Sequence, residues 1–306
     1  MQIRVLGSAA GGGFPQWNCG CANCSGVRAG TVHARPRTQE SIALSADGTR
    51  WFLINASPEI RAQIESFPPL WPRAKRHSPV SGIVLTNGDL DHCLGLLSLR
   101  ESHPITVYAT GAVRSGFAEG NTVVRTLQRF PEQVRWRDLT LGREIPLVDP
   151  DDGAETGLFM TALAIPGKLP LHLERLRAPS AEDNVGLRIR DARSGGTLAY
   201  LPAVAGASRA VADALEAADC VFFDGTFWSS DELIAAGLGT RRAEDMAHWP
   251  VGGDSGSLSL LAKLAGRRIL IHVNNTNPLL REDGPERAAA SAAGVEVAHD
   301  GLELEL

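Results

Sequence analysis

The stretch that decides the fold is VSGIVLTNGDLDHCLG, residues 80–95. Its first part, 80–86, predicts a buried strand, and the polar turn that follows carries Asp89, Asp91 and His92. Side chains at the carboxyl end of such a strand face the crevice where α/β proteins bind their ligands. The same letters also fit an Asn/Asp turn before a capped helix, with the aspartates serving the helix N-terminus. The turn alone leaves both interpretations open.

Two further apolar runs end in the same way. Residues 221–223 lead into Asp224, and residues 269–271 lead into His272. A buried carboxylate or imidazole at such a place normally has a partner. Three strands that each end in a potential metal ligand therefore favour one shared cation over three unrelated turns.

The rest of the chain alternates short apolar runs, glycine-rich turns and helical segments, which is the pattern of a layered α/β protein. Asp47-Gly48 indicates a hairpin between two of these runs. We expect strands near 3–6, 41–46, 51–55, 80–86, 104–110, 158–165, 185–190, 197–201, 220–223 and 268–273. We expect helices that begin at Ser57-Pro58 and Leu94 and further helices near 207–218, 229–236 and 255–265.

The chain contains no long Pro/Ser-rich linker, so residues 1–306 are predicted to form one domain with two sheets. The segments 147–157 and 166–184 are rich in glycine, proline and charge. We expect both to be mobile surface.

Composition argues against several classes of protein. The 30 Lys and Arg against 35 Asp and Glu give a formal net charge of −5, with no long run of one sign that would bind nucleic acid. No stretch approaches the roughly 18 apolar residues of a membrane span, and the N-terminus lacks a secretory signal pattern. We therefore expect a cytoplasmic protein with neither a nucleic-acid nor a membrane partner.

Three of the five cysteines crowd into one glycine-containing loop near residues 19–24, at Cys19, Cys21 and Cys24. A tight trio in a cytoplasmic chain favours metal binding over a disulfide framework. Three thiolates and one more donor make the closed tetrahedral site that structural zinc prefers, and unliganded or redox-active thiols are the alternative. The spacing does not reveal the fourth ligand. Its candidates are His33, His299 and Asn275.

Several motifs together carry a family resemblance over most of the chain. They are GGGFPQWNCGCANC, TNGDLDHCLGLL, DGTFW, AHWP and HVNNTNP. The chain resembles the metallo-β-lactamase superfamily, whose signature is HxHxDH followed by a bridging Asp and a final His, and within it the PqqB family. This resemblance implies an α+β fold, an αββα sandwich of two mixed sheets flanked by helices.

The chain departs from the superfamily signature at two positions. Asn87 and Asp89 stand where the first two histidines are expected, so the ligand set of the first metal is incomplete. The residues that match the second metal's ligands and the bridging carboxylate are Asp91, His92, Asp224 and His272. Hydrolysis by a metal-bridging hydroxide is therefore disfavoured. Two imidazoles with one to three carboxylates are similar to the set that leaves open positions on non-haem Fe(II), which suits iron better than zinc.

The resemblance to the PqqB family implies a role in pyrroloquinoline quinone (PQQ) biosynthesis. It implies oxygen-dependent hydroxylation of the tyrosine-derived ring in a cross-linked Glu–Tyr precursor, with Fe(II) at the active site and Zn(II) at the thiolate site. The expected partners are that precursor and dioxygen, with other proteins of the pathway as further candidates. The alternatives are a zinc hydrolase of the ordinary superfamily type and a carrier that holds the finished quinone and assists its transfer.

Other residues are candidates for the same site. His248, in the AHWP motif, could be a core residue, a fourth zinc partner or an acid–base group facing substrate, and we count it with Asp89 among the catalytic candidates. Lys168 could hold a substrate carboxylate as a point charge or lie in solvent. The glycines near the N-terminus would let the backbone pass close to the metal pocket or substrate, and Phe14 and Trp17 could line that pocket or be buried without a function.

Overall fold

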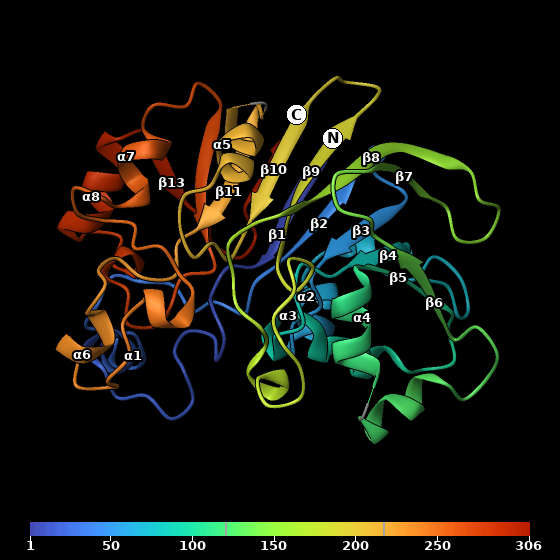
Figure 1. Cartoon of the computed structure of the whole chain (residues 1–306), viewed down its shortest axis with the longest axis horizontal. Coiled ribbons are helices and arrows are strands. Elements are labelled where there is room, and N and C mark those ends of the chain that lie inside the picture. Colours follow the sequence, from blue (N-terminus) through green and yellow to red (C-terminus); the bar gives the residue numbers. More distant parts are fainter. Residues whose placement is uncertain (120, 217) are drawn as a thin grey trace.

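Figure 1 shows the computed structural model of the chain, which describes residues 1–119, 121–216 and 218–306. Within these residues the named strands form two sheets of seven strands each. The order in the first sheet is β14 (Glu303–Glu305), β1 (Gln2–Gly7), β2 (Ser41–Ser45), β3 (Trp51–Ile54), β4 (Val80–Val84), β5 (Ile105–Ala109) and β6 (Val134–Asp138). The order in the second is β13 (Val295–Val297), β12 (Arg267–Ile271), β11 (Cys220–Asp224), β10 (Thr197–Leu201), β9 (Val185–Asp191), β8 (Glu155–Ala164) and β7 (Glu144–Val148).

Both sheets are mixed. Strands β3 to β6 run parallel in the first sheet and strands β10 to β13 run parallel in the second, whereas the remaining pairs are antiparallel. Inner parallel strands such as β3 and β11 are buried on both faces, and for this reason WFLI and the first four residues of CVFFD are apolar. The carboxyl ends of β4, β11 and β12 are therefore placed in the interior, where polar residues need partners.

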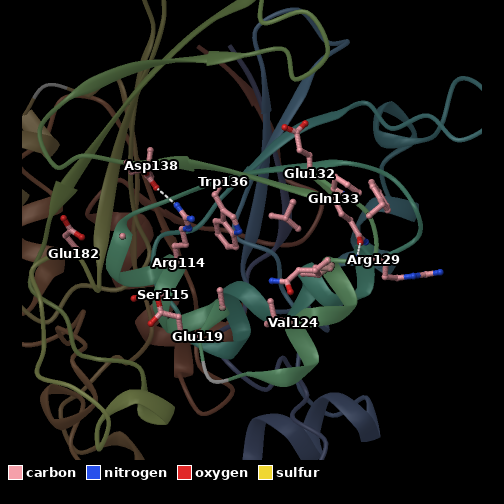
Figure 2. A pocket seen from close by; sticks show the side chains of 18 of the residues that line it. Arg114, Ser115, Glu119, Val124, Arg129, Glu132, Gln133, Trp136, Asp138 and Glu182 are labelled. Carbon is pink, nitrogen blue, oxygen red and sulfur yellow. Dashed lines mark hydrogen bonds and ion pairs between the residues drawn. The ribbon is translucent and has the colours of Figure 1, made fainter.

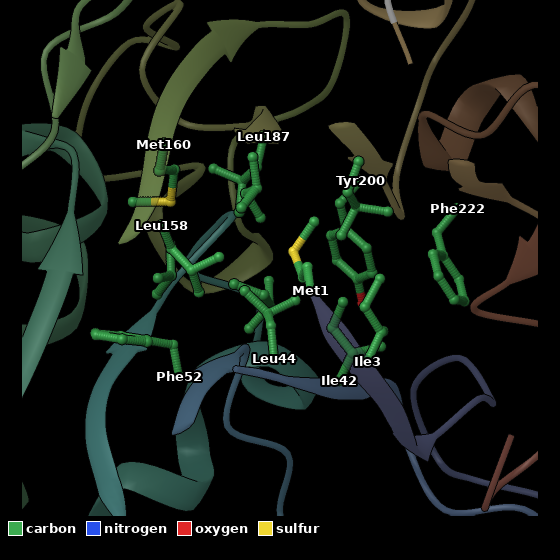
Figure 3. Close-up of a cluster of buried hydrophobic side chains, with 14 of the residues drawn as sticks. Met1, Ile3, Ile42, Leu44, Phe52, Leu158, Met160, Leu187, Tyr200 and Phe222 are labelled. Carbon is green, nitrogen blue, oxygen red and sulfur yellow. The ribbon is translucent and has the colours of Figure 1, made fainter. Parts of the chain in front are cut away.

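The main core lies between the two sheets. Ile3 and Leu44 from the first sheet meet Leu187, Tyr200 and Phe222 from the second (Figure 3). These side chains are almost fully removed from water, and their burial is the largest stabilising contribution to the sandwich.

Helices cover the outer face of each sheet. On the first sheet lie α2 (Ile60–Glu65) and α4 (Gly111–Ala118). On the second lie α1 (Ala22–Ala29), α5 (Arg209–Glu216), α7 (Ser257–Leu261) and α8 (Pro285–Ala292). The expected αββα sandwich is thus confirmed.

The remaining helical segments are short. The α-helical ones are α3 (Leu90–Cys93) and α6 (Glu232–Ala235). The 3-10 segments are η1 (Pro68–Leu70), η2 (Leu94–Leu99), η3 (Thr122–Leu127), η4 (Leu171–Leu173), η5 (Glu244–Met246) and η6 (Pro278–Leu280). None of the helices among the described residues is long and apolar enough to cross a membrane.

Some sequence expectations need correction. The segment 147–157 holds the end of β7 and the start of β8, which pair as a hairpin, so only its central turn is loop. The helix expected from Leu94 is a 3-10 segment of six residues. The short strands β6, β7, β13 and β14 were not foreseen, because partly exposed strands at sheet edges carry few apolar residues. Cys93 and Cys220 are buried.

Candidate metal centre

Three strand ends meet at one cavity of about 450 Å³. Asp91 and His92 lie in α3 directly after β4, Asp224 is the last residue of β11, and His272 is the first residue after β12. Donor atoms of Asp91, His92 and His272 lie within 4.8 Å of one another. The structure thus brings these three side chains together, whereas Asp224 lies outside this group.

His272 is held with one ring nitrogen turned toward the cluster. Its backbone is left-handed, with φ +61, and its Nε2 lies 3.1 Å from Asp91 Oδ2. Its Nδ1 lies 2.7 Å from Thr226 Oγ1, which itself donates to Asp224 Oδ1 at 2.6 Å. Because the Thr226 hydroxyl donates its proton to Asp224, its oxygen accepts a hydrogen bond from His272 Nδ1. The other ring nitrogen of His272, Nε2, is then the atom that can bind a cation.

His92 has a comparable hydroxyl at its Nδ1. Thr86 Oγ1 and Asn55 Nδ2 both lie 3.0 Å from this nitrogen, and Asn55 Oδ1 accepts from the backbone N–H of Thr86 at 3.0 Å. The other ring nitrogen, Nε2, lies 3.6 Å from Asp91 Oδ2. Asn55 reaches this place through a left-handed backbone, φ +62. The Nε2 atoms of two histidines thus converge on one Asp91 oxygen.

The electrostatics of the cluster favour a positive charge within it. Burial opposes ionisation of Asp91, but His92 and His272 hold the pKa of this carboxyl well below its usual range. Burial alone would lower the pKa of His272, yet Asp91, Asp224 and Glu40 raise it above its usual value. Burial lowers the pKa of His92 to about 4. The carboxylates around His272 therefore favour a positive charge in this cluster.

Glu40 is a part of this centre that the sequence analysis missed. Its side chain is completely buried. Glu40 Oε2 accepts a hydrogen bond from Asn55 Nδ2 at 2.8 Å and lies 3.7 Å from His92 Nε2. Glu40 Oε1 has no hydrogen-bond partner in the described part of the chain. Burial raises the pKa of Glu40 to about 8. No local signal marks this residue, because it precedes an ordinary apolar strand.

His248 belongs to the same centre. Its Nδ1 lies 2.7 Å from Asp224 Oδ2, and its ring stacks on that of His272, with centroids 5.4 Å apart and planes 25° apart. Donor atoms of Asp224, His248 and His272 form a second group within 4.8 Å. Of the alternatives left open by the sequence, a plain core position is excluded, because His248 also lines the cavity.

Lys168 and Asp89 also line the cavity. Burial and the neighbouring Asp91 raise the pKa of Asp89, and the charge of Lys168 opposes this rise. A Cβ placed on Gly11 would approach Asp91 Oδ2 to 3.3 Å, so the backbone does pass close to the centre, as expected from the glycine-rich start. Neither of the two aromatic residues lines the cavity. Phe14 is buried in the core outside the second sheet, and Trp17 is 86% exposed.

The three thiols gather at the N-terminus of α1, near α6 in Figure 1. The Sγ atoms of Cys19, Cys21 and Cys24 lie within 4.8 Å of one another, and Asn275 Nδ2 lies 3.1, 3.7 and 3.4 Å from them in that order. Burial opposes ionisation of Cys21, but the backbone N–H of Cys24 and the neighbouring thiols lower the pKa of Cys21. Burial raises the pKa of Cys24 to about 11.

Of the three candidates for a fourth zinc ligand, only Asn275 lies against the thiols. His33 is exposed, and His299 Nδ1 faces a backbone carbonyl at 3.0 Å. The side chain of Asn23, in α1, donates to the backbone carbonyls of residues 275–277 at 3.2, 3.0 and 3.0 Å. The thiol loop is thereby tied to the turn that follows His272.

Known proteins are similar to this chain over its full length. A model of the family "Beta-lactamase superfamily domain" matches residues 50–273. Coenzyme PQQ synthesis protein B of Azotobacter vinelandii is 44% identical over 307 residues and covers all of both chains, and that of Cupriavidus necator is 46% identical over 99% of each. This chain belongs to the PqqB family. The crystal structure of Zn(2+)-bound PqqB from Methylobacterium extorquens has a TM-score of 0.92 at 43% identity over the full length of both chains.

A more distant similarity is limited to the fold. A diphosphatase of the PhnP family superposes with a TM-score of 0.65 at 22% identity, covering all of this chain and 97% of the other. The αββα sandwich of PqqB is thus shared with proteins of other activities, and the donor set has to carry the functional argument.

Cavity size alone would have selected a different place in this PqqB protein. A cavity of about 990 Å³ lies between α4, η3 and β6, where Trp136 and the ion pair of Arg114 with Asp138, 3.1 Å apart, face it (Figure 2). None of the site residues expected from the sequence lines this cavity. The chemistry of the lining, rather than its volume, identifies the candidate active site.

Proposed function

We propose that this PqqB protein is a cytoplasmic, iron-dependent hydroxylase that uses dioxygen in PQQ biosynthesis. Its substrate would be the tyrosine-derived ring of the cross-linked Glu–Tyr precursor. The observation that carries this proposal is the donor set itself. One carboxylate and two imidazoles, from Asp91, His92 and His272, cluster where Asn87 and Asp89 replace the histidines needed for a second ion.

The donor chemistry fits two different ions at two places. Oxygen and imidazole donors around His272 suit Fe(II), and the softer thiols of Cys19, Cys21 and Cys24, with Asn275 beside them, suit Zn(II). The relative from Methylobacterium extorquens is Zn(2+)-bound in its crystal structure, which supports metal binding in the family.

Bound Fe(II) would supply the activation of dioxygen. The chain itself supplies orientation and a restricted pocket. The cavity of about 450 Å³ is in the usual range for a small-molecule site. Leu90, Leu171 and Phe227 give it apolar walls for an aromatic ring. Lys168 would bind a substrate carboxylate, and His248 would accept a proton from an acidic hydroxyl.

The test compares metals on the same protein. The metal-free chain is loaded with Fe(II) or Zn(II), and oxygen uptake and product mass are followed with the tyrosine-derived precursor. We expect uptake and a mass gain of oxygen with Fe(II) only, and their loss in His92→Ala. The control is His77→Ala, because His77 lines a separate cavity and should be silent. Equal turnover with Zn(II) would indicate a hydrolase, and tight quinone binding without turnover would indicate a carrier.

A further inference from the structure

Asp224 takes the place of the carboxylate that bridges two metals in the superfamily, but its contacts are those of a different role. We infer that Asp224 is a positioning residue and does not itself bind the ion. It accepts a hydrogen bond from His248 Nδ1 directly, and it orients the Thr226 hydroxyl, which accepts a hydrogen bond from His272 Nδ1. This inference rests on the proposed metal site, and it makes the Asp224–His248 pair a proton acceptor for the substrate.

The first support is that protein donors fill both oxygens of this carboxylate. Oδ1 accepts from the backbone N–H of Thr226 at 2.9 Å and from its hydroxyl at 2.6 Å. Oδ2 accepts from the backbone N–H of Val204 at 2.8 Å and from His248 Nδ1 at 2.7 Å. A carboxylate offers about four lone-pair positions, so a cation could be bound only by breaking one of these bonds. Asp224 is also completely buried, which makes each broken bond costly.

The second support is the direction of the protons. The Thr226 hydroxyl has one proton, and its shortest contact assigns that proton to Asp224. His272 Nδ1, 2.7 Å from the same hydroxyl, is then the donor to it. His248 Nδ1 faces a carboxylate oxygen, which can only accept. Both histidines therefore carry a proton on Nδ1. In the metal-free chain His272 also donates from Nε2 to Asp91 Oδ2, so the Nε2 proton of His272 is the one that has to leave when the ion binds.

The two fixed histidines then serve different purposes. His272 directs Nε2 to Asp91, within the donor group proposed for the ion. His248 lies on the cavity wall and belongs only to the second donor group, with Asp224 and His272. Its Nε2 lone pair is free to take the proton of a phenolic hydroxyl, and the resulting imidazolium is stabilised by Asp224. In this step the O–H bond breaks, an N–H bond forms, and the electron pair stays on the substrate oxygen.

The variant that separates the two roles is Asp224→Asn. Each carboxylate oxygen accepts from a backbone N–H, of Val204 or of Thr226. An amide NH2 at this position must therefore face one of these donors in either orientation, and the contact to His248 or to Thr226 is lost. Asp91→Asn is the matched control. It alters the carboxylate proposed as ligand and leaves the tautomers of both histidines unchanged.

The experiment is histidine 15N NMR on the metal-free and Zn(II)-loaded chain, combined with a crystal structure of the loaded chain. We expect His248 to be protonated on Nδ1 in both states. Asp224→Asn should change the tautomer of His248 or of His272 and weaken zinc binding about 10- to 100-fold. If Asp224→Asn does not fold, Thr226→Val gives the second readout, because it should change the tautomer of His272 and leave that of His248.

Two results would overturn the inference. One is an Asp224 oxygen at about 2.1 Å from the bound ion, which is a coordination distance. The other is a proton on Nε2 of His248 in the loaded wild-type chain. A chain that shows both tautomers but takes up no oxygen with Fe(II) would refute the proposed hydroxylase and leave the role of Asp224 intact.

Discussion

Removing a single buried hydroxyl at Thr226 should weaken metal binding without touching any proposed ligand. In Thr226→Val the side chain keeps its shape and loses contacts of 2.6 Å to Asp224 and 2.7 Å to His272 Nδ1. The N–H of a fully buried imidazole is then left without an acceptor, which costs about 1–3 kcal/mol. Loss of such a support typically lowers metal affinity about 10- to 100-fold, equivalent to about 1.4–2.8 kcal/mol.

The assay is a competition titration of Co(II) and Zn(II) against a coloured chelator, with urea unfolding of the metal-free chain measured in parallel. Thr86→Val is the matched variant at the second histidine, because Thr86 Oγ1 faces His92 Nδ1. It should give a loss of similar size. Thr140→Val, at an exposed position, is the neutral control. A Thr226→Val protein that folds and binds metal within threefold of wild type would refute the reasoning.

Three further predictions concern Asp47, Glu40 and Lys168. Burial opposes ionisation of Asp47, but hydrogen-bond donors at Thr49 and Arg50 lower its pKa. Asp47→Ala should therefore lower the free energy of unfolding in urea by about 1–2 kcal/mol at pH 7. The difference in stability between this variant and wild type should shrink below about pH 4. Burial raises the pKa of Glu40 to about 8, so the metal-free wild type should lose stability as pH rises from about 4.5 to 8, by at most about 1.4 kcal/mol per pH unit. The stability of Glu40→Gln, measured by thermal unfolding, should not fall with pH in this way. Stability–pH curves that run parallel for the variant and the wild type would contradict the prediction. Lys168→Met should raise KM for the precursor about 10- to 100-fold in steady-state kinetics and leave metal affinity unchanged.

The strand ends were predictable because apolar runs and the polar residues that follow them are local in sequence. The runs before Asp91, Asp224 and His272 became β4, β11 and β12, and their carboxyl ends meet at one cavity. The hairpin at Asp47-Gly48 was predictable for the same reason, since the turn needs a residue such as Gly48 with φ +73.

The supporting contacts were not predictable, because they depend on distances across the fold. Asn55 and Glu40 reach His92 from different strands, and neither stands in a motif. The pairing of His248 with Asp224 spans 24 residues and depends on where the loop after α6 returns to the sheet. Phe14 and Trp17 follow the glycine-rich turn in sequence, but their side chains do not line the pocket. The sequence does not show in which direction the side chains after such a turn point.

The most direct test of the central claim is anomalous diffraction at the iron edge from crystals of the Fe(II)-loaded chain. We predict one iron peak with Asp91 Oδ2, His92 Nε2 and His272 Nε2 all at coordination distance, about 2.1 Å. Iron found only among the thiols of Cys19, Cys21 and Cys24, or no iron peak between the two histidines, would contradict the proposed metal centre.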